Sequence, residues 1–224
     1  DIIDMQEVLH HQLEVLKTGL PEYTVVGVGR EDGKTAGEYA PIFFKQAKYT
    51  LLDQNTFWLC EKPDSVGMVG WDAALTRIAT WVKLQDKKTG QILMVVNTHF
   101  DHIGTEARRN SALLIIEKIK EIVGTSPAIL TGDFNVSEDW DAYKTITNNE
   151  FILKDAHKVA GKRTGVDFTY HNFGKIPAEK CEKIDFIFVT PQIRVISSYI
   201  PFSQLNDTLF LSDHNPEIVE LEIK

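Results

Sequence analysis

The sequence predicts an α+β fold of two packed, mainly antiparallel sheets with helices on the outside. Most of the chain consists of short strand-like runs, which are rich in β-branched and aromatic residues and bounded by Gly, Asp, Asn or Pro. Only two long amphipathic helical patterns occur, one near the start and one in the middle of the chain. Many strands with few helices favour two stacked sheets that the helices cover from outside.

The first half of the chain begins with a strand and a helix. Ile2–Met5 has the composition of a short strand, and leucines recur at helical spacing over Glu7–Lys17, where Gly19 to Pro21 supply the stop. Five strand-like runs follow, several of which are expected to pair as neighbours in hairpins. They are Tyr23–Val28, Ala40–Lys45, Tyr49–Leu59, Ala79–Leu84 and Gln91–Phe100.

The second half begins with a helix expected over Glu106–Val123. Its apolar residues form one stripe, opposite charged residues such as Glu117 and Lys118, so this helix should cover a sheet. The elements expected after it are the strand Pro127–Thr131, a short helix over Asp139–Thr147, the strands Lys183–Thr190 and Gln192–Ile200, and a tail strand over Glu217–Lys224. No linker or internal repeat divides the chain, so residues 1–224 are interpreted as a single domain.

Composition is that of an ordinary globular protein, with 43% hydrophobic and 25% charged residues. The net charge of -8 argues against a protein whose affinity comes mainly from neutralising a nucleic-acid backbone, although it leaves room for a local basic pocket. Cys60 and Cys181 have neither disulfide-framework nor zinc-site spacing. No apolar run approaches the ~20 residues that span a bilayer, and no signal peptide is present.

Polar residues suited to metal or proton chemistry follow the ends of several apolar runs. Because a buried carboxylate is costly unless it is paired, hydrogen-bonded or bound to a metal, acids at these positions need partners. The segments are DMQEV at 4–8, VVNTHFDH at 95–102, ILTGDFN at 129–135, EKIDFIFV at 182–189 and FLSDHNP at 210–216.

Each of these residues also has a purely structural explanation. The alternatives are a helix start at Glu7, a turn at Asp133 and Asn135, a buried core histidine at His99 and an Asx turn at Asp213. Asp185 lies inside an apolar strand and is the hardest to explain in this way. Because five such coincidences occur together, a functional site is the better interpretation.

Three other chemistries fit the sequence less well. Ser212, Asp213 and His214 have the residue types of a hydrolase triad, but consecutive extended residues point to opposite faces, and no G-x-S-x-G elbow is present. THFDH is close to the di-zinc motif H-x-H-x-D-H, but Asn97 stands where the first histidine would be. Glu7 and His10 have the E-x-x-H spacing of di-iron bundles, which need that motif twice on facing helices.

The ordered motifs resemble those of the endonuclease/exonuclease/phosphatase superfamily, also called DNase I-like, and the likeness covers nearly the whole chain. The matching segments are Gln6-Glu7, Asn97-Thr98-His99, Gly132-Asp133-Phe134-Asn135, Ile184-Asp185-Phe186-Ile187-Phe188 and Ser212-Asp213-His214. The resemblance implies a four-layer α/β/β/α sandwich and hydrolysis of a phosphate ester that depends on Mg²⁺ or Mn²⁺.

The resemblance also implies roles for single residues. Glu7 is expected as the principal metal ligand, assisted by Asp213, and hard cations of this kind prefer oxygen ligands. The expected catalytic residues are His99 as a phosphate contact, Asp133 and Asn135 to position or deprotonate water, and His214 held by Asp185 as base or phosphoryl contact. Whether His214 or Asp133 is the base stays open. The resemblance also implies an additional N-terminal strand with an Asn, which is absent here. Either that strand, with any export signal before it, lies upstream of this sequence, or this protein lacks part of the site, and the sequence leaves both alternatives open.

Other polar residues are expected to shape the substrate pocket. A guanidinium matches phosphate oxygens, which makes Arg77 a reasonable contact. The expected substrate-binding residues are Arg77, Trp71, Asp101, His102 and Arg108, although Arg77 could form a surface ion pair and Trp71 could be a packing residue. The acidic balance favours a small phosphoester or lipid headgroup as the partner of a monomeric enzyme. A nuclease acting on DNA or RNA, and a non-catalytic phosphate-binding module of the same fold, are the alternatives.

Overall fold

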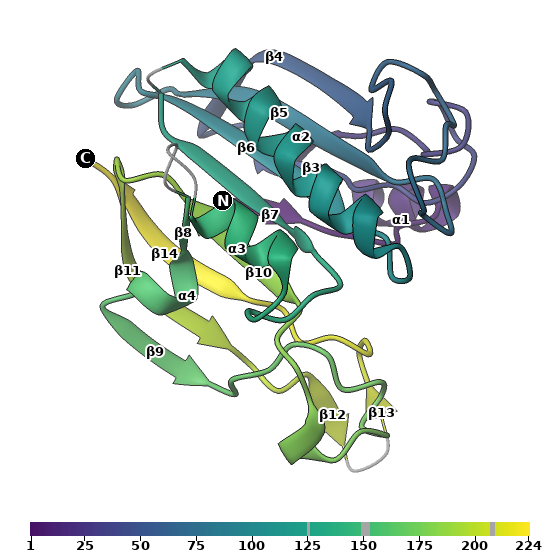
Figure 1. Cartoon of the computed structure of the whole chain (residues 1–224). Coiled ribbons are helices and arrows are strands. Elements are labelled where there is room, and N and C mark those ends of the chain that lie inside the picture. Colours follow the sequence, from purple (N-terminus) through teal and green to yellow (C-terminus); the bar gives the residue numbers. More distant parts are fainter. Residues whose placement is uncertain (125, 149–152, 207–208) are drawn as a thin grey trace.

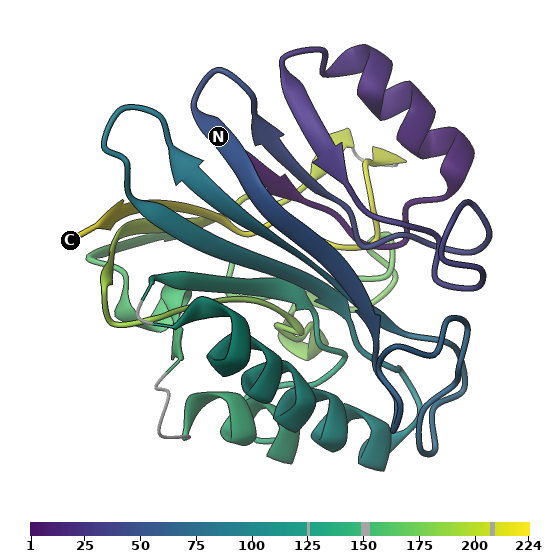
Figure 2. The ribbon, with the colours of Figure 1, turned by 90° about the horizontal axis from the view of Figure 1, so that it is seen from above.

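Four layers stack in the order helix, sheet, sheet, helix, as the sequence analysis predicted (Figures 1 and 2). The computed structural model describes residues 1–224 except 125, 149–152 and 207–208. In the view from above, α1 (His10–Gly19) lies on one outer face, and α2 (Thr105–Val123) lies with α3 (Asp141–Thr147) on the other. Among the described residues, no helix combines the length and apolar character needed to cross a membrane.

One inner layer is a six-stranded sheet in the order β4-β5-β6-β7-β10-β8. Its strands are β4 (Tyr49–Trp58), β5 (Ile78–Asp86), β6 (Ile92–His99), β7 (Ala128–Asp133), β8 (Lys154–Asp155) and β10 (Asp185–Val189). Neighbouring strands are antiparallel except β6 and β7, which run parallel. Parallel neighbours need a crossover, and α2 provides it on the outer face of the sheet (Figure 1).

The facing layer consists of two three-stranded sheets, ordered β1-β3-β2 and β14-β11-β9. Their strands are β1 (Ile2–Asp4), β2 (Tyr23–Val26), β3 (Ile42–Lys45), β9 (Lys162–Gly165), β11 (Ile193–Ile200) and β14 (Ile218–Ile223). Of these pairs only β9 and β11 are parallel. A separate two-stranded hairpin, β12 (Gln204–Asn206) with β13 (Leu209–Phe210), extends from the lower end of the molecule in Figure 1.

The central strands are buried on both faces, which explains their nearly continuous apolar runs. On β6, Met94 and Val96 pack in the core beneath α2 and α3, whereas the alternate residues Leu93 and Val95 pack in the core between the sheets. A third apolar cluster joins α1 to the sheet below it, where Leu13 of the helix is buried. The strict alternation fixes the register of the strands that carry the site.

The helix α1 begins three residues later than the sequence predicted. Glu7 adopts a left-handed backbone, with φ of 59°, and the carbonyl of Val8 accepts a hydrogen bond from the Tyr39 amide at 2.8 Å. These two residues therefore cannot form the first helical turn, and the helix starts at His10. The prediction of a helix start at Glu7 was wrong, and the carboxylate of Glu7 projects from a turn instead.

The region between α3 and β10 holds short elements that the sequence analysis did not predict. Besides β8 and β9 they are α4 (Ala156–Val159) and the 3-10 helix η1 (Ala178–Lys180). Elements of two to four residues show no recognisable hydrophobic period. The long strands and α2, in contrast, were predicted to within a few residues at their ends.

Candidate active site at one edge of the six-stranded sheet

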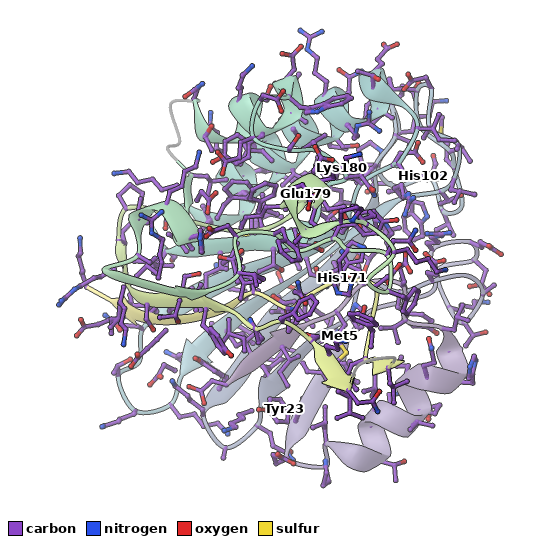
Figure 3. The ribbon with its side chains drawn as sticks, turned by 90° about the horizontal axis from the view of Figure 1, so that it is seen from below. Met5, Tyr23, His102, His171, Glu179 and Lys180 are labelled. Atoms are coloured by element: carbon purple, nitrogen blue, oxygen red, sulfur yellow. The ribbon has the colours of Figure 1, made fainter. Side chains whose placement is uncertain are left out.

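Three of the predicted catalytic residues meet because their strands end or begin at the same edge. β6 ends at His99 and β7 ends at Asp133, and these two residues are partners in the parallel register. β10 runs the other way and begins at Asp185, the antiparallel partner of Asp133. Figure 3 looks toward this edge, with His102 beyond the end of β6, Met5 beyond the end of β1, and His171 between them.

Close approach of β6 and β7 depends on a glycine. A Cβ atom at Gly132 would lie 2.3 Å from the carbonyl oxygen of Thr98, the residue opposite it. Any larger residue would push the two strands apart. Gly132 precedes Asp133, so the same position controls how near the Asp133 carboxylate comes to His99, whose Nε2 lies 3.5 Å from Asp133 Oδ2.

Asp185 and His214 form the contact that the sequence analysis expected. Nδ1 of His214 lies 2.7 Å from Oδ2 of Asp185, and the Tyr170 ring packs against the imidazole with centroids 4.9 Å apart. Burial would lower the pKa of His214, but the hydrogen bond to Asp185 and the charges of Asp185, Asp133 and Asp213 raise it to about 9. The imidazole is therefore a cation at neutral pH, with Nε2 left for another partner.

Asp133 is buried beside a second carboxylate. Burial, and after it the negative charge of Asp185, raise the pKa of Asp133 to about 8, while His214 and the Asn135 amide act in the opposite direction. The backbone amide of Asn135 donates to Oδ1 of Asp133 at 2.8 Å, and the side-chain amide of Asn135 donates to the Phe100 carbonyl at 3.0 Å. Asn135 has φ of 50°, a conformation that asparagine tolerates better than most residues.

His99 and Glu7 complete this edge on the side of α1. Burial and the charges of Arg77 and Arg30 hold the pKa of His99 well below its usual value, so its imidazole is neutral. Nε2 of His99 lies 4.0 Å from Oε1 of Glu7, whose side chain is 63% exposed. Partial burial, and then the charges of Glu38 and Asp213, raise the pKa of Glu7.

Carboxylates and one imidazole at this edge could hold a metal ion. Among the described residues, ligand atoms of Asp133, Asp185 and His214 lie within 4.8 Å of one another. Glu7 and Asp213, the ligands predicted from the sequence, lie outside that group but act on each other electrostatically. Oxygen donors of this kind suit a hard divalent cation. Burial, and after it the charge of Asp185, raise the pKa of Asp133, and a bound cation would lower that pKa and favour the carboxylate.

Arg77 and His102 lie next to this edge. The Arg77 side chain is buried, with Nε 3.5 Å from Oδ1 of Asp101 and Nη2 3.1 Å from Nδ1 of His102. Nη1 of Arg77 has no hydrogen-bond partner among the described residues, whereas the His102 side chain is largely exposed. Arg77 is therefore a buried residue and not a surface ion pair, and its contact with substrate stays a prediction.

Asp101 does not have the geometry of the substrate-binding residue that the sequence predicted. It is 1% exposed, and its carboxylate accepts hydrogen bonds from backbone amides at 2.8 to 3.3 Å. The donors are the amides of Ala74, Leu75, Ile103 and Gly104. These hydrogen bonds join two loops, and the contact with Nε orients Arg77. The hydrogen-bond acceptor sites of the Asp101 carboxylate are therefore all used within the protein.

Arg108 and Trp71 lie on the α2 side of the site. Arg108 is buried, donates to the Asp101 carbonyl at 2.9 Å and lies over the Trp140 ring at 5.0 Å. It lines a hollow of about 700 Å³ together with Trp140 and Val136, the residue after Asn135. Trp71 packs against the core beneath α2, so direct contact of Trp71 with substrate stays a prediction.

Several residues at this edge were given no role in the site from the sequence. Asp4 ends β1, and burial raises its pKa to about 7 although Thr131 donates to its Oδ2 at 2.8 Å. Asn97 is fully buried, and its Oδ1 accepts from the Gln6 side chain at 2.7 Å. An acid at the end of the first strand was a usable signal for Asp4. No such signal existed for Tyr170, since it contacts His214 only in the folded protein and lies far from it in sequence.

The chain is similar to a protein family, to solved structures and to a viral protein over nearly its whole length. The profile of the Endonuclease/Exonuclease/phosphatase family matches residues 1–214. An endonuclease/exonuclease/phosphatase from Bacteroides vulgatus is 64% identical, with a TM-score of 0.97, over 100% of this chain and 85% of that one. A mannosyl-6-phosphatase from Bacteroides thetaiotaomicron is 38% identical, with a TM-score of 0.92 and the same coverage of both chains. An uncharacterized protein of Acanthamoeba polyphaga mimivirus is 28% identical over 236 residues, which are 99% of this chain and 86% of that protein.

Proposed function

Because the chain belongs to the endonuclease/exonuclease/phosphatase family and is a phosphoester hydrolase of that family, we propose that it hydrolyses small phosphate monoesters, sugar phosphates above all, with Mg²⁺ or Mn²⁺. The observation that carries the proposal is the convergence of His99, Asp133, Asp185 and His214 at one sheet edge. A mannosyl-6-phosphatase among the similar structures supports a sugar phosphate as the substrate class.

The charge of His214 suits stabilisation of a phosphoryl group. Asp185 accepts from Nδ1, which fixes the ring and leaves Nε2 to donate to a non-bridging oxygen. Negative charge accumulates on these oxygens during displacement at phosphorus, and donors placed in advance stabilise it. Arg77, through its free Nη1, and the neutral His99 are the proposed additional phosphate contacts.

Asp133 is the proposed group that takes the proton from the attacking water. With pKa values of about 9 and about 8, His214 and Asp133 are both mostly protonated at pH 7. Asp133 has the lower pKa of the two, so it has the larger ionised fraction, and that carboxylate is the form that accepts the proton. A raised pKa makes a carboxylate a stronger base. Asn135 holds the Asp133 carboxylate through its amide and would orient the water with its side chain.

The proposed metal ligands are Glu7 and Asp213, with the group of Asp133, Asp185 and His214 beside them. When bound, a divalent cation supplies charge neutralisation at the phosphoryl oxygens. The turn that places Glu7 in a left-handed conformation leaves its carboxylate exposed at the edge, as a ligand position requires.

A substrate panel tests the proposal. The purified protein is incubated with Mg²⁺, with Mn²⁺ or with EDTA, and with mannose 6-phosphate, p-nitrophenyl phosphate, bis-p-nitrophenyl phosphate, single-stranded DNA, duplex DNA or RNA. We expect release of phosphate from the monoesters with either metal and none with EDTA. Faster cleavage of nucleic acid would instead support the nuclease alternative, and metal binding without hydrolysis would support the binding module.

Matched variants connect the activity to the site. Asp185→Asn and His214→Ala should each lower kcat by about 10³-fold or more, because both remove the oriented imidazolium. Asp53→Asn makes the same chemical change as the first variant at an exposed position on β4 and should leave kcat unchanged. Near-normal rates in either site variant would contradict the assignment.

A further inference from the structure

Thr169 joins the two segments that carry Asp185 and His214. It is fully buried in the loop that follows β9. Its hydroxyl accepts hydrogen bonds from the backbone amides of Ile184 at 3.0 Å and Asp185 at 3.1 Å. On the other side, its carbonyl oxygen accepts from the amide of Asn215, next to His214, at 2.7 Å. One residue thus touches the backbone on both sides of the Asp185–His214 contact.

The neighbours of Thr169 extend the same bridge. The Asn215 side chain donates to the carbonyl of Phe168 at 3.3 Å, and the His171 amide donates to the Asp213 carbonyl at 3.0 Å. Tyr170 forms isolated β-bridges with Glu182 and with His214. Residues 168–171 therefore lie as a spacer between the start of β10 and the segment 213–215. Toward β10, the Thr169 side chain contributes two of the hydrogen bonds, because its Oγ1 accepts from the backbone amides of Ile184 and Asp185.

We propose that the Thr169 hydroxyl is a positioning group, which fixes the start of β10 relative to the segment 213–215 and so keeps Asp185 within hydrogen-bond distance of His214. The expected effect of the Thr169 hydroxyl on catalysis rests on the proposed function, whereas its expected effect on the distance between Asp185 and His214 does not. A hydroxyl oxygen has two acceptor sites, and here both face backbone amides. Without it, two buried amides lose their partner and the chain must shift to find another.

The threonine side chain allows a clean substitution series. Thr169→Val keeps the shape and removes the hydroxyl, whereas Thr169→Ser keeps the hydroxyl and removes a methyl group. Thr190 provides the matched control, since it is buried at the opposite end of β10 and its hydroxyl accepts from the Ala128 amide at 3.0 Å. Thr190→Val therefore removes one buried amide-to-hydroxyl hydrogen bond just beyond the far end of β10, away from the site, whereas Thr169→Val removes two.

Two measurements test the proposal on the full chain. The first is the kcat and KM for p-nitrophenyl phosphate with Mg²⁺. The second, which needs no activity, is the proton NMR signal of the His214 Nδ1–H, identified by its loss in His214→Gln. We expect Thr169→Val to lower kcat by about tenfold to a hundredfold with little change in KM, because small displacements of a reacting group have effects of this size. The Nδ1–H signal should move or broaden. Thr169→Ser and Thr190→Val should match the wild type in both measurements.

The outcomes separate this proposal from the proposed function. If the wild type hydrolyses nothing, the NMR signal still decides, and an unchanged signal in Thr169→Val overturns the positioning role. Wild-type kcat in Thr169→Val overturns it as well. Should Thr169→Val fail to fold, Thr169→Cys takes its place, because a thiol fills similar space but accepts hydrogen bonds weakly. An equal loss in Thr190→Val would show a general effect of lost stability and would also overturn the proposal.

Discussion

Two aspartates that follow neighbouring parallel strands have opposite electrostatics. Asp101 comes two residues after β6 and Asp133 ends β7, and both are buried. Burial raises the pKa of each, but backbone amides and the charge of Arg77 lower that of Asp101 to about 2. Asp133 has one amide partner and the negative charge of Asp185 nearby, so its pKa rises to about 8. The number of hydrogen-bond donors, rather than burial, separates a structural carboxylate from a reactive one.

The largest effect expected from this difference is on catalysis. Asp133→Asn should lower kcat by about 10³-fold, because the amide cannot accept the proton from water. It should not destabilise the fold, because the buried Asp133 carboxyl group, with its pKa of about 8, is mostly neutral at pH 7 and the amide that replaces it is neutral as well. Rates of phosphate release and urea unfolding curves check the two parts. A variant that is both active and less stable would reverse the roles assigned to the two aspartates.

Asp101→Asn should show the opposite pattern in the free energy of unfolding. The amide group has one acceptor oxygen and directs N–H donors at backbone amides, so we expect a loss of about 3 kcal/mol. The measurement is the urea midpoint at pH 7, with Asp53→Asn as the exposed control. Because the pKa of Asp101 is lower in the folded state, its contribution to stability is present above pH 4 and lost as the pH falls toward 2.

A pH series of unfolding should reveal the group around Asp133. The folded-state pKa values of His214 and Asp133, about 9 and about 8, are both above the values of the free side chains. The folded protein therefore binds more protons than the unfolded chain, and in EDTA its stability should fall as the pH rises from 6.5 to 9. His214→Gln should flatten the curve in this range. An unchanged slope in that variant would contradict the raised pKa.

Divalent cations should produce the smallest effect. Mg²⁺ at tenfold excess over its Kd is expected to stabilise the folded protein by about 1.4 kcal/mol, which thermal unfolding at pH 8 detects as a rise in Tm. Glu7→Gln should abolish most of this rise while the Tm without metal stays close to that of the wild type, because the Glu7 side chain is exposed. An equal rise in both proteins would exclude Glu7 as a ligand.

The sequence was a good guide wherever a pattern extends over many residues. The strands of the six-stranded sheet alternate between two cores, and the acids and histidines at their ends were recognisable as a group. Short elements such as β8 and α4 carry no period, and the turn at Glu7 opposes the helix that the leucines predict. The hydrogen-bond partners of the site residues were also recognisable only in the three-dimensional structure. The sequence could not show that the Asp101 carboxylate is fully occupied, because two of its donors, the amides of Ala74 and Leu75, come from a loop distant in sequence.

The arrangement of the site also bears on when the protein becomes active as it folds. Asp4 and Thr131, hydrogen-bonded beneath the edge, are 127 residues apart, and His214 comes from near the other end of the described chain. Contacts between residues so distant in sequence form late, after helices such as α2. Recovery of phosphoester-hydrolase activity during refolding should therefore lag behind the recovery of helical circular dichroism.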